Sequence, residues 1–309
     1  MHRPRLAPLD LRRGLRSFVS SAALFVAALL SSTACEYGHR VTFRFLEGPK
    51  DAIALAYVAP DRLLVLAGTE RRGKSVSIFY DSVHSVEILR FPVSRYATGI
   101  RGEIDGKFLL SIARRGVAQG ERAGAIEEWN VRGQLLDSIE FPGPVVAITG
   151  SRAGIVYALT PVAGGFAIVG TRMADGAAVS RTQLRENVAT IDQCVLGRAT
   201  YVLTSSPGTN VVRLIDVKLG SSIATPLVAE RPRCSIDGSS IVGLHATSFG
   251  SEVSVLHLST TRQRVERMVG APDAVDLEPS GDRLFLLRRS GDRSRIDIWL
   301  RSDLAEAGL

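Results

Sequence analysis

A short apolar segment that follows a turn of Gly, Asp or Pro occurs six times along the 309-residue chain. Clear copies are PDRLLVL from Pro60 and SGDRLFLL from Ser280. The six copies are marked by Leu63, Phe108, Ile155, Thr200, Ile241 and Leu284. Successive markers lie 45, 47, 45, 41 and 43 residues apart. A period of about 40–50 residues is typical of proteins that repeat one small β-sheet around a ring.

Each copy continues into further segments of β type. SVSIFY from Ser75 and RIDIWL from Arg295 are rich in branched and aromatic residues, and a third segment such as SVEILRF from Ser85 usually follows. No amphipathic helix of useful length interrupts them. We therefore predict an all-β β-propeller with six four-stranded blades. Seven blades, or two packed sheets, are the alternatives.

The two ends of the chain share the strongest internal match. Residues 48–55, GPKDAIAL, correspond to residues 270–277, GAPDAVDL, and an Arg-Val pair precedes each of them. The N-terminal strand from Arg40 is therefore expected to be an outer blade strand. Because the last unit lacks such a strand, the N-terminal strand would complete that blade and close the ring. The propeller domain is predicted to span residues 40–309.

The segment PDAVDLEPSGDRLFLL from Pro272 is similar to the YVTN or lactonase-type propeller repeat. In that family a blade begins with a Pro-x-x-Ile/Val strand, and a Pro-Asp/Ser-Gly turn leads to a short apolar strand. The resemblance extends over residues 40–309 and is clearest in the first and last units. It implies a propeller, usually seven-bladed in that family, but not one activity, because many unrelated functions use this fold.

Residues 1–34 have the three parts of a secretory signal: a basic stretch, an apolar run over 17–30, and a small-residue site before Cys35. The run is shorter than the roughly 20 residues that span a bilayer, so an uncleaved anchor is the weaker alternative. The sequence STAC at 32–35 resembles the lipobox of bacterial lipoproteins. That resemblance implies export, lipidation of Cys35, and a membrane-anchored protein that faces the periplasm.

The expected anchor is short. Residues 35–39 form the predicted tether, and residues 36–39 span about 13–15 Å when extended. The first strand is expected to run toward an arginine-rich face from the opposite, acidic face, which receives Asp61, Asp81, Asp105, Asp175, Asp237 and Asp282. The acidic face is therefore expected to lie nearer the membrane. The lipobox departs from its family at Ser32, where leucine is usual. Ordinary cleavage that leaves a free thiol on Cys35 is the alternative.

Removal of residues 1–34 changes the charge balance. That segment carries a net charge of +4 out of the formal +7 of the chain, which leaves +3 on the mature part. A charge this small gives little support for binding to DNA or RNA. We expect no nucleic-acid partner.

Two cysteines remain if Cys35 carries a lipid. Cys194 and Cys234 would then form an even pair in an oxidising compartment. A disulfide between them is one possibility. Two separate buried thiols, which behave as small apolar side chains, are the other.

Motifs of catalysis and metal binding are missing from the sequence. It contains no HExxH, GxSxG, P-loop, GxGxxG or CxxC pattern. The histidines that follow Cys35 stand in different units, without the short spacing of a metal-binding pair. We therefore predict no catalytic residue, no metal and no cofactor.

The basic residues are unevenly distributed on the propeller topology. Loops between blades and loops after each second strand share one face, and many bases fall there. The candidate surface for an anionic partner consists of Arg71, Arg72, Arg114, Arg115, Arg288 and Arg289. Such a surface would attract an acidic protein, lipid or polymer. The alternative is that these arginines are simply solvated.

These features favour a non-catalytic binding or assembly scaffold in the cell envelope, with an envelope protein or an anionic polymer as partner. The alternative is a lactonase-like or lyase-type propeller enzyme, with a central-channel site fed by Asp51, Asp192, Asp273 and Asp276. A solute-binding lipoprotein ranks lower, because it would need an apolar pocket that the sequence does not display.

Overall fold

The computed structural model describes most of the chain between residues 44 and 300. The described ranges are 44–58, 61–80, 87–103, 105–114, 123–196, 199–235, 238–248, 250–258, 263–270, 273–281 and 283–300. The regular secondary structure in these ranges consists of β-strands, with no helix. Cys35, the predicted signal, the predicted tether at 35–39 and Arg115 lie outside the described residues.

Twenty-four strands form six antiparallel sheets of four strands each, which we number as blades in chain order. Blade 1 consists of β2 (Ala52–Val58), β3 (Arg62–Thr69), β4 (Gly73–Tyr80) and β5 (Glu87–Val93). Blade 2 consists of β6 (Ala97–Gly102), β7 (Lys107–Ala113), β8 (Gly124–Asn130) and β9 (Leu135–Phe141). Blade 3 consists of β10 (Ala147–Ile148), β11 (Ile155–Val162), β12 (Gly165–Arg172) and β13 (Ala178–Leu184).

The second half of the chain repeats this arrangement. Blade 4 consists of β14 (Thr190–Leu196), β15 (Ala199–Ser205), β16 (Val211–Asp216) and β17 (Ser222–Val228). Blade 5 consists of β18 (Glu230–Cys234), β19 (Ser240–Thr247), β20 (Gly250–Leu258) and β21 (Gln263–Gly270). Blade 6 consists of β22 (Ala274–Ser280), β23 (Arg283–Ser290), β24 (Arg293–Leu300) and β1 (Arg44–Gly48).

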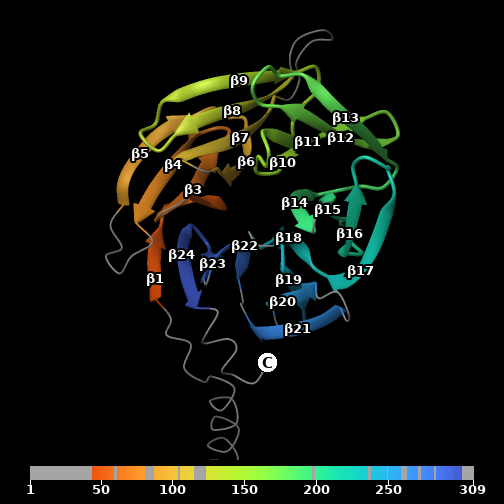
Figure 1. Ribbon diagram of the computed structural model, residues 1–309. Helices are drawn as coiled ribbons and strands as arrows, with labels where there is room; N and C mark the ends of the chain where they lie inside the picture. The colour runs from red at the N-terminus through yellow and green to blue at the C-terminus, as the bar shows by residue number, and fades with distance from the viewer. Residues whose placement is uncertain are drawn as a thin grey trace, which may run out of the picture. The chain divides into compact units, whose positions relative to one another are not determined.

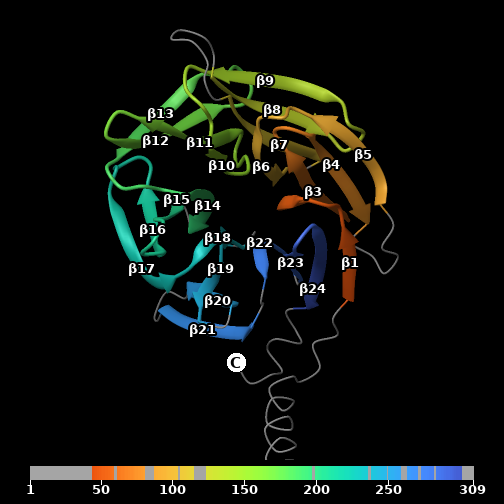
Figure 2. The ribbon, with the colours of Figure 1, turned by 180° about the vertical axis from the view of Figure 1, so that it is seen from behind.

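The first strand of each blade lies at the centre of a ring. β2, β6, β10, β14, β18 and β22 contact one another in that order, and β22 contacts β2 again. Figure 1 shows this ring face-on, and Figure 2 shows it from behind. The structure confirms the predicted all-β propeller with six four-stranded blades rather than seven.

The sequence repeat marks the second strand of every blade. Each of the six markers falls in β3, β7, β11, β15, β19 or β23. Leu63, Phe108 and Ile241 have no exposed surface. These strands read as nearly continuous apolar runs because neighbouring blades cover both of their faces. The repeat is therefore the signature of the interfaces between blades.

The last blade is completed by the start of the described chain. β1 pairs antiparallel with β24, from Arg44 opposite Ile298 to Gly48 opposite Ser294. Leu46 is buried and belongs, together with Leu55 of blade 1, to the apolar cluster that joins blades 6 and 1. The N-terminal strand is thus the outer strand of the last blade, as predicted. It is described from Arg44 onward, and residues 40–43 lie outside the described residues.

The match between the two chain ends corresponds to equivalent turns. Asp51 and Asp273 have φ angles of 55° and 63°, in the left-handed region that Asp tolerates better than most residues. The carbonyl of Asp51 accepts a hydrogen bond from the N–H of Gly68 at 3.0 Å, and that of Asp273 accepts one from Arg289 at 2.9 Å. Each turn therefore joins the start of a first strand to the end of its second strand.

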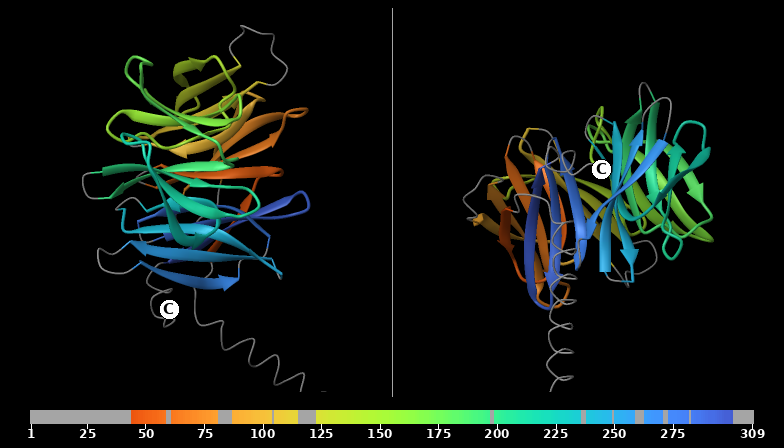
Figure 3. Two further views of the ribbon diagram at one scale, coloured as in Figure 1. Left: turned by 90° about the vertical axis from the view of Figure 1, so that its right-hand side faces the viewer. Right: turned by 90° about the horizontal axis from the view of Figure 1, so that it is seen from below.

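The ring has two faces, which differ in the loops they carry. The inter-blade face carries the loops between blades, such as 49–51 and 94–96, and the loops between second and third strands, such as 70–72. The intra-blade face carries the remaining loops, such as 149–154 and 173–177. Figure 3 shows the stacked blades from the side. β1 starts on the intra-blade face, because Arg44 lies near the end of β24.

Candidate functional site

The predicted basic surface lies on the inter-blade face. Arg71, Arg72, Arg114 and Arg289 are exposed there. Arg288 is half-buried, and its Nη1 donates a hydrogen bond to the buried Asp297 carboxylate at 3.1 Å. Arg288 therefore neutralises a carboxylate within its own blade and is not a free surface charge.

Closure of the ring brings these bases together on three adjacent blades. Blades 6, 1 and 2 are neighbours, and they carry a basic patch that we define as Arg71, Arg72, Arg95, Arg114 and Arg289. In this patch only Arg72 has an acidic neighbour within 4 Å among the described residues, Asp51 at 3.9 Å. The remaining four guanidinium groups form no ion pair with the described part of the chain.

Cys194 and Cys234 form a disulfide between blades 4 and 5. The two Cα atoms are 5.5 Å apart, and both side chains are buried. Cys194 belongs to β14 and Cys234 to β18, which are neighbouring first strands at the centre of the ring. The bond therefore fastens two blades together at the wall of the central channel.

Two of the four carboxylates proposed for a channel site reach the channel. Asp276 is fully buried, and its Oδ2 accepts a hydrogen bond from the N–H of Leu55 at 2.9 Å. Asp192 accepts one from the N–H of Cys234, also at 2.9 Å. Each carboxylate thus joins its own first strand to the first strand of the following blade. Asp51 and Asp273 lie instead at the inter-blade turns described above.

Two buried arginines cross the channel. Arg233 donates from Nη2 to Asp276 at 3.1 Å and from Nε to the carbonyl of Leu277 at 3.2 Å. Arg101 donates from Nη2 to the carbonyl of Ile191 in blade 4 at 3.1 Å. Burial and the charge of Arg233 lower the pKa of Arg101 to about 10, which leaves it protonated at neutral pH. Arg233 is only 4% exposed, so it belongs to the channel and adds no charge to the exposed basic face.

These residues surround a central cavity of about 400 Å³. Side chains or loops of all six blades line it, including Tyr57, Arg101, Asp192, Arg233 and Glu278. The loop 150–153 also lines it and belongs to the intra-blade face. The ring of Tyr57 stacks on Phe285 with centroids 5.5 Å apart. The cavity is therefore a polar compartment at the ring centre, bordered by the intra-blade face.

Two glutamates that line this cavity have pKa values raised to about 7. Burial raises the pKa of Glu278 to about 7, although Arg233 and Arg101 oppose the shift. Burial also raises the pKa of Glu103 to about 7, although the N–H of Ser151 opposes it by donating to the Glu103 carboxylate. Both carboxyl groups thus change charge close to pH 7.

Of the residues that line this cavity, Asp192 is the one that the sequence placed at a central-channel site. Arg101, Glu103, Arg233 and Glu278 belong to no motif and lie far apart along the chain. The signal that was present is the placement of charged residues in or just after first strands, as in ERPRC at 230–234 and AVDLEPS at 274–280. Charged residues in strands at the centre of a ring must be paired or must serve a ligand.

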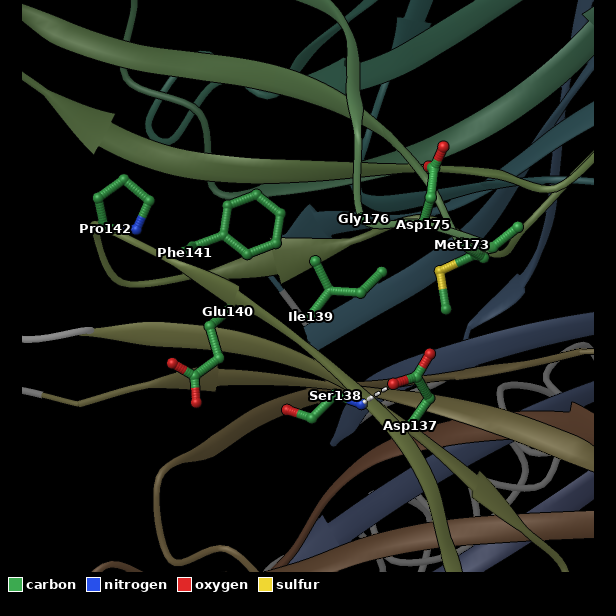
Figure 4. A pocket seen from close by; sticks show the side chains of 10 residues that line it. Asp137, Ser138, Ile139, Glu140, Phe141, Pro142, Met173, Asp175 and Gly176 are labelled. Atoms are coloured by element: carbon green, nitrogen blue, oxygen red, sulfur yellow. Dashed lines mark hydrogen bonds between the residues drawn. The ribbon is translucent and has the colours of Figure 1, made fainter.

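A second hollow lies on the outer rim of the ring, between β9 and the β12–β13 turn. It measures about 790 Å³ and is shown in Figure 4 with Ile139, Phe141 and Met173 on its walls. Asp137 and Glu140 beside it are exposed. The N–H of Ser138 donates to the Asp137 carboxylate at 2.7 Å, which occupies one amide near the start of β9. This groove brings together no buried, unpartnered polar group of the kind found in the channel.

Among the described residues, no helix is long and apolar enough to cross a bilayer. Within the same residues, no group of three or more His, Cys, Asp or Glu side chains is arranged to hold a metal ion. The channel carboxylates are instead interleaved with arginines.

No protein-family model and no curated protein matches this sequence. The structure is nevertheless similar to solved propellers. A chain in the crystal structure of a mitotic checkpoint complex aligns with a TM-score of 0.55 at 11% identity, over 84% of this chain and 96% of that chain. The WD40 domain of Neurospora crassa Pan2 aligns with a TM-score of 0.51 at 10% identity, over 81% and 89%.

Identities this low show the fold alone. The class defined by the fold is a six-bladed, WD40-like β-propeller. The particular features of this chain are the basic patch on blades 6, 1 and 2 and the polar cavity at the ring centre, crossed by Arg101 and Arg233.

Proposed function

We propose that this protein is a non-catalytic propeller scaffold that binds an acidic envelope protein. We further propose that it is anchored either to the outer surface of a bacterial cytoplasmic membrane or to an outer membrane. WD40-like propellers commonly serve as protein-binding scaffolds, which supports the binding role. The observation that carries the proposal is the basic patch. Four of its five arginines form no ion pair with the described residues, and exposed unpaired cations speed encounters with an anionic surface and select against cationic ones.

The patch can be tested with two matched variants. Replacement of Arg71, Arg72, Arg114 and Arg115 by Ser removes four of the charges that the sequence assigns to the basic surface. The control replaces exposed bases elsewhere by Ser, namely Arg132, Arg172, Arg181 and Lys218. After cross-linking in cells, the patch variant is expected to lose its acidic partner, and the control to keep it. Retention of every partner by the patch variant would refute the proposed binding face.

The same cross-linked preparation identifies the class of partner. An acidic protein recovered with the wild type and released by rising salt supports the proposal, because exposed charge pairs are screened by salt. Recovery of an anionic polymer or of lipid alone, with no protein, argues for a different class of ligand and against a protein scaffold.

The anchor rests on the lipobox-like sequence before Cys35. We expect the mature protein to begin at Cys35 with an acylated N-terminus, which mass spectrometry of the N-terminal peptide detects. A Cys35→Ser variant should move from the membrane fraction to the soluble envelope fraction. An unmodified Cys35 in membrane-bound protein would contradict lipid anchoring while leaving the scaffold proposal open to its own test.

The place where the chain enters the ring supports an orientation for the anchored protein. Because β1 starts on the intra-blade face, we propose that this face is turned toward the membrane and that the basic patch points away from it. Footprinting on liposomes should then leave the loops of Arg71 and Arg114 reactive. Protection of these loops by liposomes would show the opposite orientation.

A propeller enzyme is the second candidate. Glu103 and Glu278, whose pKa values lie near 7, are suited to acid–base chemistry at the ring centre. Against this, Asp192 and Asp276 are engaged in contacts between blades. Stoichiometric metal in the purified protein, together with hydrolysis of a lactone panel that Glu278→Gln abolishes, would favour the enzyme over the scaffold.

A further inference from the structure

Four buried polar atoms around the central cavity have no hydrogen-bond partner. They are Nε of Arg101, Nη1 of Arg233, Oε1 of Gln193 and Oε2 of Glu278. Of these, Oε2 of Glu278 lies 3.5 Å from Nε of Arg233, in an ion pair without a hydrogen bond. All four residues line the cavity, and Arg101, Arg233 and Gln193 are more than nine-tenths buried. Native proteins satisfy nearly all buried polar groups, because an unpaired one is costly. Such atoms gathered around one cavity indicate a ligand that supplies the missing partners.

The unpartnered atoms differ in character, which restricts the ligand. The two guanidinium nitrogens are cationic donors and require an acceptor. The oxygens of Gln193 and of ionised Glu278 are acceptors and require a donor. Asp192 adds a second carboxylate 3.9 Å from Nε of Arg101. A matching ligand therefore carries an anionic acceptor and a cationic donor in one small molecule.

We propose that the central cavity binds a small amino-acid-type zwitterion, with its carboxylate toward Arg101 and Arg233 and its ammonium group toward Asp192 and Glu278. A cavity of about 400 Å³ lies in the size range of small-molecule sites. The site is separate from the basic patch, so it stands or falls independently of the scaffold role. The sequence ranked solute binding low because it shows no apolar pocket. A polar cavity that suits a zwitterion raises that rank.

Ligands of a single charge fit this cavity less well. An inorganic anion would meet the carboxylates of Glu103, Asp192 and Glu278. A metal cation would meet two buried guanidinium groups, and no metal-binding cluster exists among the described residues. A neutral sugar would usually stack on several aromatic rings, whereas Tyr57 is the aromatic side chain that lines this cavity.

The zwitterion gives the site a defined response to pH. Glu278 must be ionised to pair with an ammonium group, and burial raises its pKa to about 7. Binding should therefore strengthen as the pH rises from 6 to 8. The charged groups that face this cavity or Glu278 are Arg101, Glu103, Arg152, Asp192, Arg233 and Asp276. Ionisation of Glu103 near pH 7 acts in the same direction, because it adds negative charge toward the ammonium group.

The experiment is isothermal titration of the full-length protein with the free α-amino acids, at pH 6 and pH 8. Matched probes remove one charge at a time: N-acetyl amino acids lack the ammonium group, and amino-acid amides lack the carboxylate. We expect binding by at least one zwitterion, and a loss of 10-fold or more in affinity for both derivatives of that amino acid. Inorganic phosphate tests whether a simple anion binds, and glucose tests whether a neutral sugar binds.

Two channel variants and one distant control complete the test. Glu278→Gln keeps the shape of the side chain and should weaken binding about 10-fold or more at pH 8, with loss of the pH dependence. Arg101→Lys should weaken binding to a similar extent, because Lys lacks the guanidinium geometry. Glu140→Gln, exposed on β9 at the outer rim, should change affinity less than about 2-fold. Thermal melting of each variant checks that it is folded.

Three results would overturn the proposal. The first is the absence of binding by any free amino acid at either pH. The second is equal binding of the N-acetyl derivative or of the amide, which would show that one charge suffices. The third is unchanged affinity and unchanged pH dependence in folded Glu278→Gln protein. Should Arg101→Lys fail to fold, the isosteric Glu278→Gln variant still decides the question.

Discussion

The carboxylate of Asp276 in β22 accepts a hydrogen bond from the backbone N–H of Leu55 in β2, across 221 residues of sequence. This contact joins the last blade to the first at the centre of the ring, while β1 joins them at the outer edge. The same carboxylate holds the buried guanidinium of Arg233 from blade 5. One side chain therefore links three blades.

Replacement of Asp276 by Asn should destabilise the protein by about 3–5 kcal/mol, because it leaves the charge of Arg233 buried without its main partner. Urea denaturation measures this change in the free energy of unfolding. The control is Asp175→Asn, whose carboxylate is half exposed and pairs with Arg172 at the surface. A cost for Asp276→Asn no greater than that of the control would show that the buried pair does not hold the blades together.

Loss of the disulfide between Cys194 and Cys234 should lower the free energy of unfolding by about 2–4 kcal/mol. The bond closes a loop between positions 40 residues apart and so restricts the unfolded chain. A Cys194→Ala, Cys234→Ala double variant, compared by thermal melting with oxidised wild type, measures the effect. Reduced wild type should resemble the double variant. Two free thiols in protein purified from the envelope would contradict the bond itself.

The closing strand should contribute through its buried side chain. Leu46 is 2% exposed between blades 6 and 1, so Leu46→Ala should cost about 2–5 kcal/mol. Its neighbour Phe45 is 52% exposed, and Cζ of Arg295 lies 4.5 Å from the centroid of its ring. Phe45→Ala should therefore cost less than about 1 kcal/mol. Chemical denaturation distinguishes the two. Equal losses of stability for the two variants would contradict the burial of Leu46 and the exposure of Phe45 in β1.

The stability of the protein should depend on pH through the channel glutamates. The pKa of Glu278 is raised from 4.5 to about 7 in the folded protein. Between these values the unfolded chain releases a proton that the folded chain keeps, so stability falls as the pH rises from about 4.5 to 7. Above about pH 7 the contribution no longer changes.

Glu278→Gln should therefore raise the melting temperature more at pH 8 than at pH 5. The full contribution is on the order of 3–4 kcal/mol, because the pKa rises from 4.5 to about 7 and one pKa unit corresponds to about 1.4 kcal/mol. Melting curves at the two pH values test this. The exposed Glu140→Gln serves as control and should shift both curves alike. A larger gain for Glu278→Gln at pH 5 than at pH 8 would reverse the sign of the argument.

The sequence by itself determined the blades. Strand, turn and burial are local properties, so a buried second strand after each turn repeats at the blade period, and six markers predict six blades. The match between residues 48–55 and 270–277 was also sufficient to predict closure by the N-terminal strand, because a repeated pattern places equivalent residues at equivalent positions.

Only the tertiary structure decided which charges meet. Arg101 reaches Ile191 across 90 residues, and Arg233 reaches Asp276 across 43, because the ring turns the inner strands of separate blades toward one channel. No local pattern distinguishes these arginines from those of exposed loops such as Arg71. Ring closure likewise brought the bases of the last blade beside those of the first two. The repeat specified how each blade is built, whereas the geometry of the closed ring specified the sites.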